Sequence, residues 1–442
     1  MKVKNTISCC ALSFCASVSL STCSKDNAPE NDLSSPTKPN ILLIIADDFG
    51  LDACPNYNIG ATKPNMPHLQ SMANNGITFG NCWAAPMSSP TRAAVLTGKY
   101  GVKTGVLNAS NASTIQSSEK TLQAYLDEQL GKVYSHSIIG KWHLSNNEPN
   151  RPTQMGIDYF AGLLSGAAQD YNQWDLVENG VSSPSTEYIT SKTTDLAIEW
   201  INAQENNWFC WLAYTAPHTP FHLPPGHMHS QGDLPADQAS INANPLPYFM
   251  AMAESMDYEI GRLFENIPAE ELENTVIIFI GDNGTSAQVA QSPYISNRSK
   301  GSLYQGGVAV PLIVSGKGVA RKGARDRSLI HAADLFSTIA QIAGVTTSEY
   351  ENSKSFLPLL TQAVPNSRRY NYSEVLNSTP AKSGYTIRNN TYKLFVLDNG
   401  SERFYNLTAD PYETSNLINR LSDAEEAVYN ELKAEALSIR GS

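Results

Sequence analysis

The chain has 442 residues, of which 41% are hydrophobic and 17% are charged. That length exceeds a typical single core, so we expect one large domain and a smaller one. The formal net charge is −11, which argues against a nucleic-acid binder that works through a broad basic surface. An anionic substrate would require positive charge concentrated in one pocket, because the molecule as a whole repels anions.

The N-terminal segment resembles a bacterial export signal and is set apart from the fold. A basic start at Lys2 precedes a largely apolar stretch, which predicts a signal peptide over residues 1–22. Cys23 lies where a lipobox places the lipidated cysteine, and residues 23–38 are polar enough to form a flexible tether. We therefore expect an exported periplasmic or cell-surface lipoprotein, with an ordinary cleaved signal peptide as the alternative.

Three cysteines remain after this segment: Cys54, Cys82 and Cys210. They are too few and too widely spaced for a disulfide framework or a zinc site, and at most one disulfide can form among them. No later apolar run approaches the length that a membrane-spanning helix needs.

Short apolar runs alternate with helical patterns across the large domain, which we place at residues 39–347. Strands are predicted at residues 41–45, 137–139, 208–214, 276–280 and 310–314, and helices at residues 67–75, 122–130, 248–264 and 333–343. The alternation predicts an α/β fold with a mostly parallel sheet covered by helices on both faces.

A different pattern follows Gly344 and defines a C-terminal subdomain, which we place at residues 348–442. Strands are predicted at residues 370–376, 384–388, 391–397 and 403–406, and a final helix at residues 424–439. Asn399-Gly400 between the last two strands is a strong hairpin signal. These elements predict a small antiparallel sheet with one packing helix.

The run from Ser88 to Gly98 predicts a short helix with chemistry at its start. Pro90 is favoured at the first position of a helix, and Gly98 at its end. Ser88 then lies just before the helix, where free backbone N–H groups and the helix dipole attract negative charge. Arg92 can lie on the same face and reach back toward Ser88. The alternative is an ordinary helix with a proline start and a glycine end.

Polar residues follow two of the predicted strands. Asp47 and Asp48 come after residues 41–45, and Asp282 and Asn283 come after residues 276–280. Ligands of open α/β sheets bind at the carboxyl ends of the strands. Three carboxylates and an amide oxygen would form an all-oxygen site for a hard divalent cation, calcium before magnesium. Either acidic pair alone also suits a simple helix cap.

Residues 88–98 match the pattern Ser/Cys-x-Pro-x-Arg-x-x-x-x-Thr-Gly of formylglycine-dependent sulfatases, whose first residue is oxidised after translation. Segments similar to those of this family follow in the family's order at residues 39–48, 140–144, 217–221, 282–284, 300–311 and 405–417. The chain thus resembles serine-type bacterial sulfatases of the alkaline-phosphatase-like superfamily. The resemblance implies a large mixed, mostly parallel sheet sandwiched by helices, with a smaller C-terminal antiparallel sheet and helix.

The resemblance also implies a sulfuric ester hydrolase that uses formylglycine made from Ser88 and one Ca²⁺ ion. The implied metal ligands are Asp47, Asp48, Asp282, Asn283 and an oxygen of the modified Ser88. The modification matters because an unmodified serine lacks the second oxygen through which sulfate would be expelled again.

The same resemblance assigns catalytic roles to five charged side chains. Arg92 would hold the modified residue, and Lys141 and Lys300 would bind sulfate oxygens. His218, together with Lys300, would protonate the leaving oxygen, and His143 would accept the proton that lets sulfate depart. Taken singly, each histidine also suits a hydrogen-bonded structural role, and each lysine a solvated surface.

The chain departs from many sulfatases at two positions, where Gln305 and Ala309 replace an acidic and a basic residue. The two changes remove one acid and one base together, which favours a paired structural change over a loss of activity. We therefore expect no ion pair at this place.

We expect the substrate to be a sulfated glycan or saccharide, because an exported lipoprotein of this kind suits glycan breakdown. Side chains that can stack on or hydrogen-bond a sugar are Tyr159, Tyr171, Asn172, Gln173, Trp174 and Asp175, although Tyr159 equally suits the core. The expected protein partner is a formylglycine-generating enzyme, and no nucleic acid is expected. The alternatives are a phosphatase or phosphonate monoester hydrolase with the same fold, and a non-catalytic glycan-binding lipoprotein.

Overall fold

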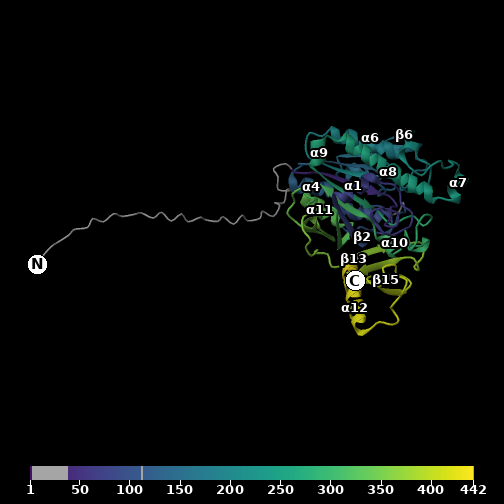
Figure 1. Cartoon of the computed structure of the whole chain (residues 1–442), viewed down its shortest axis with the longest axis vertical. Helices are drawn as coiled ribbons and strands as arrows, with labels where there is room; N and C mark the ends of the chain where they lie inside the picture. The colour runs from purple at the N-terminus through teal and green to yellow at the C-terminus, as the bar shows by residue number, and fades with distance from the viewer. Residues whose placement is uncertain (2–37, 111–112, 442) are drawn as a thin grey trace.

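The computed structural model describes residue 1, residues 38–110 and residues 113–441. The expected signal peptide and tether, including Cys23, therefore lie outside the described residues apart from their two ends. Figure 1 shows a large body, coloured from purple to green, and a smaller yellow body at one end of it.

A ten-stranded mixed sheet forms the centre of the large body, in the order β10-β2-β9-β8-β1-β7-β3-β4-β5-β6. Its strands are β1 (Asn40–Ala46), β2 (Gly76–Trp83), β3 (Ser135–Gly140), β4 (Tyr159–Gly162), β5 (Trp174–Glu178), β6 (Val181–Ser185), β7 (Trp208–Ala213), β8 (Thr275–Gly281), β9 (Leu312–Gly316) and β10 (Ala324–His331). The central strands from β8 to β4 run parallel, as do β10 and β2. β9 and the β5–β6 edge pair antiparallel. The prediction of a mixed, mostly parallel sheet is confirmed.

Both faces of this sheet are covered, which is why every residue of β1 is buried. Leu42 and Ile44 pack into one core, and Leu43 and Ile45 pack into the other. The first core also holds side chains from α1 (Pro67–Asn74), α6 (Ile189–Asn202) and α8 (Leu246–Asn266). The second holds side chains from α2 (Ser88–Thr97), α4 (Leu122–Leu130) and α11 (Asp334–Ile342). Alternate side chains of one strand thus hold helices on opposite faces.

The remaining elements of the large body are short. They are α3 (Gly101–Thr104), α5 (Arg151–Gln154), α7 (Gln238–Ala243), α9 (Ala269–Glu273), α10 (Gln305–Val308), β11 (Glu349–Tyr350), β12 (Ser353–Lys354), and the 3₁₀ turns η2 (Gly226–Met228), η3 (Ser296–Arg298) and η4 (Leu357–Leu360). Cys54, Cys82 and Cys210 are buried and free. Within the described part of the chain, no helix combines the length and apolarity needed to cross a membrane.

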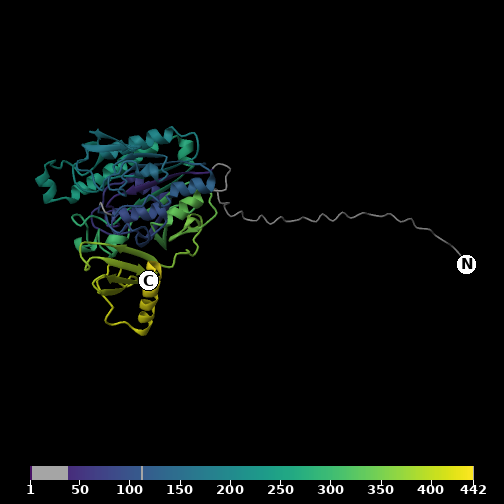
Figure 2. The ribbon, with the colours of Figure 1, turned by 180° about the vertical axis from the view of Figure 1, so that it is seen from behind.

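The smaller body is the expected antiparallel sheet with one helix. Its elements are β13 (Asn371–Val375), β14 (Gly384–Arg388), β15 (Tyr392–Leu397), β16 (Glu402–Asn406) and α12 (Asp423–Arg440). Leu432 of α12 packs against Tyr372 and Phe404 of the sheet. In Figures 1 and 2, α12 runs back so that the C-terminus lies at the boundary between the two bodies.

Candidate active site

The carboxyl ends of β1 and β8 bring the predicted oxygen donors together. The two strands pair in parallel along their whole length, so Asp47 and Asp48 lie beside Asp282 and Asn283. The Asp48 N–H donates to Asp282 Oδ1 at 3.2 Å, and Asn283 Nδ2 donates to Asp48 Oδ1 at 2.8 Å. At most 1% of the surface of each of these residues is exposed. The cluster is therefore a buried set of oxygen donors at one edge of the sheet.

Ser88 lies at the N-terminus of α2, beside this cluster. Its Oγ is 3.0 Å from Asp47 Oδ1 and 3.1 Å from Asn283 Oδ1, so the hydroxyl can donate to either. The helix begins earlier than the sequence predicts: Met87 is the N-cap, Ser88 is the first helical residue and Pro90 the third. Ser88 therefore lies inside the first turn, where the backbone N–H groups are still free of helical partners.

Two cations of the predicted set lie on the inner side of the cluster. Arg92 Nη2 is 2.9 Å from Asp282 Oδ2, and its Nη1 donates to the Lys141 carbonyl oxygen at 2.9 Å. The Lys141 ammonium group pairs with Asp47. Arg92 thus ties α2 to the segment after β3 and to the segment after β8.

The neighbouring charges keep Asp47 and Asp48 ionised. Burial alone would raise the pKa of Asp47, but the charges of Lys141 and His218 lower it below its ordinary value. Burial would likewise raise the pKa of Asp48, and Lys300, whose Nζ is 2.5 Å from Asp48 Oδ1, lowers it. Ionised carboxylates are the form that a metal ion requires.

His143 enters the cluster from the segment after β3. Its backbone has a positive φ of 57°, its N–H donates to the Leu164 carbonyl oxygen, and its own carbonyl oxygen accepts from Ser89 Oγ at 2.8 Å. Burial, reinforced by the charges of Lys141 and Arg92, lowers the pKa of His143 to about 2. The ring is therefore neutral and has a free lone pair with which to accept a proton.

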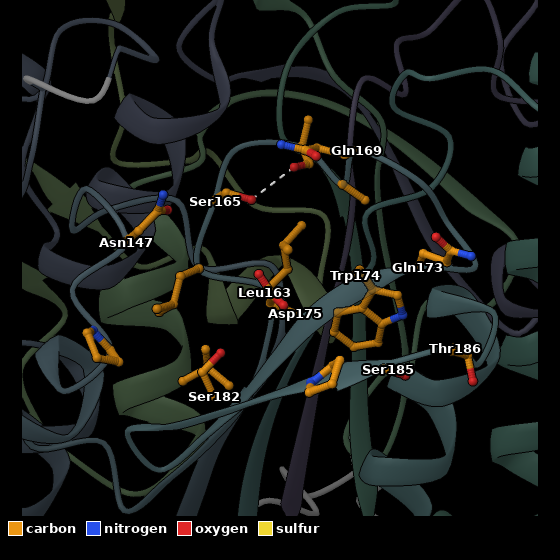
Figure 3. Close-up of a pocket in the computed structure, with 16 residues that line it drawn as sticks. Asn147, Leu163, Ser165, Gln169, Gln173, Trp174, Asp175, Ser182, Ser185 and Thr186 are labelled. Atoms are coloured by element: carbon orange, nitrogen blue, oxygen red, sulfur yellow. Dashed lines mark hydrogen bonds between the residues drawn. The ribbon is translucent and has the colours of Figure 1, made fainter.

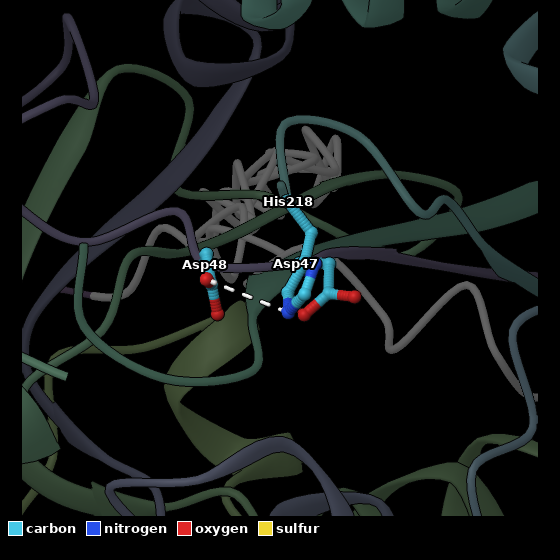
Figure 4. A group of neighbouring side chains, drawn as sticks. All are labelled: Asp47, Asp48 and His218. Carbon is cyan, nitrogen blue, oxygen red and sulfur yellow. Dashed lines mark ion pairs between the residues drawn. The ribbon is translucent and has the colours of Figure 1, made fainter. Parts of the chain in front are cut away.

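His218 reaches the cluster from the segment after β7 (Figure 4). Its Nδ1 lies 2.7 Å from the Thr219 carbonyl oxygen, so this nitrogen carries a proton and donates it to that bond. Its Nε2 faces Asp48 Oδ2 at 3.8 Å, and 13% of the side chain is exposed. Nε2 is thus the ring nitrogen that can exchange a proton with a ligand at the cluster.

The donor set fits a hard divalent cation. Ligand atoms of Asp47, Asp48 and His218 lie within 4.8 Å of one another, and the carboxylates and the Asn283 amide offer the oxygen donors that calcium prefers. Two buried polar atoms of the site, Arg92 Nε and His143 Nδ1, have no hydrogen-bond partner among the described residues. Such unpaired atoms are costly unless a ligand or an added oxygen satisfies them, so the site also fits a modified Ser88.

The structure therefore brings together every residue predicted for the site from the sequence. These residues are Asp47, Asp48, Ser88, Arg92, Lys141, His143, His218, Asp282, Asn283 and Lys300. Their catalytic and metal-binding roles stay predictions.

A pocket of about 720 Å³ has Ser165 in its lining (Figure 3), one residue before the glycine that packs against His143. A Cβ added to this glycine, Gly166, would lie 2.3 Å from His143 Nε2. Uncharged polar side chains such as Gln169 and Gln173 line the pocket together with Trp174, and its one charged residue is Asp175. The pocket thus suits a neutral, hydroxyl-rich group better than a second anion.

The expectation that Tyr171 offers its ring to a sugar is wrong, because only 1% of this residue is exposed. Its hydroxyl lies 3.0 Å from the Thr215 carbonyl oxygen and 2.7 Å from that of His218. Tyr171 therefore positions the segment that carries His218. Tyr159 stacks on Trp200 at the surface of the first core and is not part of the pocket.

Two supporting residues escaped the sequence analysis. Ser89 and Gly166 both hold His143, the first by a hydrogen bond and the second by close packing against the ring. Position 89 is unspecified in the sulfatase pattern, so Ser89 did not stand out in the sequence. A glycine in a loop likewise gives no signal of a long-range contact. Gln305, which departs from the family pattern, accepts a hydrogen bond from Trp83 Nε1 at 2.9 Å and so has a structural partner.

The mixed, mostly parallel sheet covered by helices, with the small C-terminal sheet, is the fold of the alkaline-phosphatase-like hydrolases. The chain belongs to the sulfatase family, since the family described as Sulfatase matches residues 39–345. A second family, described as N-sulphoglucosamine sulphohydrolase, C-terminal, matches residues 298–441. Sulfuric ester hydrolysis is the reaction class of this family.

Individual sulfatases are similar at low identity. The uncharacterized sulfatase YdeN of Escherichia coli is 26% identical over 71% of this chain, which spans 64% of YdeN and so less than two thirds of it. N-acetylglucosamine-6-O-sulfatase of Bacteroides thetaiotaomicron is 25% identical over 93% of this chain and 87% of its own length. The crystal structure of Ps i-CgsB in complex with k-i-k-neocarrahexaose shares the fold, with a TM-score of 0.76, 23% identity, and coverage of 91% of this chain and 93% of that chain.

Proposed function

We propose that the chain releases sulfate from a sulfated carbohydrate, using formylglycine made from Ser88 and one calcium ion. The observation that carries the proposal is the place of Ser88, whose Oγ touches both Asp47 and Asn283 inside a buried ring of carboxylates and cations. A nucleophile that attacks an anionic ester requires such a surrounding, because the cations offset the charge of the ester.

Asp47, Asp48, Asp282, Asn283 and an oxygen of residue 88 would hold the calcium ion. When bound, the ion supplies a Lewis acid for a sulfate oxygen, and formylglycine supplies the oxygen that attacks sulfur. Lys141 and Lys300 now pair with carboxylates. Once those carboxylates coordinate a dication, both ammonium groups can donate to the remaining sulfate oxygens.

Proton transfers would fall to the two histidines. His218 Nε2 faces the cluster and would protonate the leaving sugar oxygen, while its Nδ1–H stays bonded to the Thr219 carbonyl oxygen. His143 is neutral, so it would accept the proton whose removal lets sulfate leave residue 88. Arg92 would hold residue 88 through its unpartnered Nε.

The carbohydrate part of the proposal rests on three observations. One relative is named for N-acetylglucosamine 6-O-sulfate, and one solved structure with this fold contains a neocarrahexaose. The pocket lined by Ser165 offers Gln169, Gln173 and Trp174, which suit the hydroxyl groups and apolar face of a sugar ring.

The proposal is tested on chain produced together with a serine-type formylglycine-generating enzyme, which would be its partner in the cell. We expect the peptide that contains Ser88 to weigh two hydrogen atoms less in mass spectrometry, and the protein to release sulfate from a panel of sulfated saccharides. Ser88→Ala should release none. If the oxidised chain releases phosphate or methylphosphonate but no sulfate, the phosphatase or phosphonate hydrolase alternative holds; if it releases nothing while still binding glycans, the non-catalytic alternative holds.

Calcium is tested separately from formylglycine. Removal of divalent cations with a chelator should abolish sulfate release and lower the thermal unfolding midpoint, since like charges of the cluster lose their counterion. Ca²⁺ should restore both quantities more fully than Mg²⁺ at equal concentration. An undiminished rate in chelator would exclude the metal.

We also propose that the protein is exported and anchored through a lipid on Cys23. The support is the sequence of residues 1–38, namely a basic and apolar start, a lipobox-like cysteine and a polar tether. Fractionation of cells that produce wild-type or Cys23→Ser protein tests it: the wild type should partition with membranes, and the variant should not.

A further inference from the structure

A second pocket, of about 760 Å³, opens between the large body and the C-terminal sheet. We call it the interdomain pocket and define it by Met87, Arg298, Lys300, Tyr304, Lys382 and Arg403, which all line it. Met87 directly precedes Ser88, and Lys300 pairs with Asp48 of the cluster. The interdomain pocket therefore adjoins the candidate sulfate site, on a different set of residues from the pocket lined by Ser165.

Two of the four cations that line this pocket lack the polar partners that surface cations usually have. Arg403 is half-buried and Lys382 is exposed, and the side chain of neither makes an ion pair or hydrogen bond among the described residues. Arg403 instead lies over the rings of Tyr304 and Phe395, 5.5 and 5.4 Å from their centroids. Ring faces orient a guanidinium group and leave its edge N–H groups free for a planar anion.

Arg298 belongs to the same arrangement. Its guanidinium group lies 4.6 Å from the centroid of the Tyr304 ring, and Nη1 donates to the Glu413 carbonyl oxygen at 2.8 Å. Two arginines thus contact one tyrosine ring.

The carboxylate in the pocket lining is neutralised by a lysine, and Asp410, outside the lining, is hydrogen-bonded. Glu413, the one carboxylate in its lining, is 2% exposed; its Oε1 pairs with Lys393 at 2.6 Å and its Oε2 accepts the Gln305 N–H. Asp410 accepts hydrogen bonds from the Thr414 and Ser415 N–H groups. The pocket is therefore positive in a chain whose net charge is −11, which is the local concentration of charge that an anionic ligand requires.

We propose that the interdomain pocket binds a second anionic group of the substrate while the first lies at Lys141 and Lys300. That group would be a sulfate ester or a uronate carboxylate on the sugar next to the one that loses sulfate. The preferred substrate is then a glycan fragment with at least two negative charges. This inference rests on the proposed function, because it assumes that the sulfate to be cleaved occupies the cluster.

The test compares substrates that differ in one charge. Matured enzyme is given a monosulfated disaccharide, the same disaccharide with a second sulfate on the neighbouring sugar, and a third form with a uronate in place of that neighbour. We expect the wild type to favour a doubly charged form through a lower KM, and the ratio of kcat/KM values for doubly to singly charged substrate to fall about tenfold to a hundredfold in Arg403→Gln. The better of the two doubly charged substrates identifies the group as sulfate or carboxylate.

Two further variants separate binding from folding and from general charge effects. Lys382→Gln changes an exposed side chain that makes no ion pair or hydrogen bond among the described residues. It should also lower this ratio. Arg327→Gln removes an exposed arginine of β10 outside the pocket and should leave the ratio unchanged. An unchanged ratio in both Arg403→Gln and Lys382→Gln overturns the inference. Absence of sulfate release by the wild type from all three substrates would instead overturn the proposed function.

Discussion

At the scale of single residues, the protonation state of His143 decides whether it can act as the base that we propose. Burial and the charges of Lys141 and Arg92 lower its pKa to about 2, against about 6.5 for an ordinary histidine. A group with so low a pKa is neutral at and around neutral pH. The acidic limb of the pH–rate profile should therefore arise from another group.

Nuclear magnetic resonance of histidine-labelled protein tests this directly. We expect the ring signals of His143, assigned through the His143→Gln variant, to stay constant between about pH 5 and pH 9, while a histidine in an unstructured tag titrates near its ordinary pKa. A His143 signal that moves with the tag would contradict the prediction.

Gly166 supports His143 through its lack of a side chain. Because a Cβ there would lie 2.3 Å from His143 Nε2, Gly166→Ala must displace the ring from the cluster. We expect kcat to fall about tenfold or more, since small misplacements of a catalytic group are costly. Gly226→Ala is the matched control, because a Cβ at Gly226 meets no atom within 4 Å. Equal rates in the two variants would show that the ring position is unimportant.

At the scale of secondary structure elements, α8 caps α1. The N-cap of α1, Met66, has no capping side chain. Asp257 of α8 supplies the missing acceptors, since its Oδ2 accepts the His68 N–H at 3.0 Å and its Oδ1 accepts the Leu69 N–H at 2.8 Å. The first helix after β1 is thus fixed by a helix that lies far away in the sequence.

Asp257→Ala should destabilise the protein by about 2 kcal/mol, because two backbone N–H groups lose their acceptor. Burial raises the pKa of Asp257 to about 6, above its value in the unfolded chain. The folded state therefore binds this proton more tightly, and the contribution of Asp257 is largest below about pH 4 and falls as the pH rises through 6. Urea unfolding should accordingly show a larger cost of Asp257→Ala at low pH. Asp233→Ala, at an exposed loop position, should change stability little.

Strands that are buried on both faces can be predicted from the sequence, whereas edge strands cannot. β1 and β8 are continuous runs of Ile, Leu, Val and Phe, and the prediction of both strands is confirmed. β6 reads Val-Ser-Ser-Pro-Ser and is an edge strand. It is stabilised by pairing with a neighbouring strand rather than by apolar burial, so its sequence carries no strand pattern. α6 is rich in threonine and isoleucine, which lower helix propensity, and tertiary packing overrides that preference.

The site follows the same rule. Asp47 and Asp282 could be placed together from the sequence, since each ends a recognisable buried strand of one parallel sheet. The contacts of Gly166 and Tyr171 could not, because both depend on loops whose course no periodicity encodes. From the sequence, the ring of Tyr171 was expected to stack on a sugar. The residue is buried instead, and its hydroxyl donates a hydrogen bond to the His218 carbonyl oxygen.

At the scale of the whole molecule, a buried ion pair of the smaller body forms hydrogen bonds to the large body. Lys393 of β15 is fully buried, and its Nζ donates to Glu413 Oε1 at 2.6 Å and to the Leu303 carbonyl oxygen at 2.7 Å. Glu413 in turn accepts the N–H of Gln305, in α10 of the large body. The same pair neutralises the acid of the interdomain pocket, so stability and pocket charge depend on one contact.

Lys393→Ala should destabilise the protein by about 3–5 kcal/mol, because Glu413 is then left buried without its counterion. The matched control is Lys433→Ala, which breaks the partly exposed pair of Lys433 with Glu402 and should cost about 1 kcal/mol or less. Chemical denaturation of both variants measures the difference. Similar losses in the two would mean that the buried pair does not hold the bodies together.

The burial of Ser88 means that its oxidation must precede folding. Only 1% of its surface is exposed, and the helix that starts with it is buried along its whole length. An enzyme that oxidises this side chain must bind the peptide on both sides of it. The folded protein does not permit this, because the whole helix is buried. If Ser88 is oxidised as proposed, the reaction has to occur on the nascent or unfolded polypeptide. A molecule that folds before Ser88 is oxidised would remain inactive. Adding the oxidising enzyme to native protein should accordingly leave Ser88 unaltered, whereas adding it to a denatured sample before refolding should convert it.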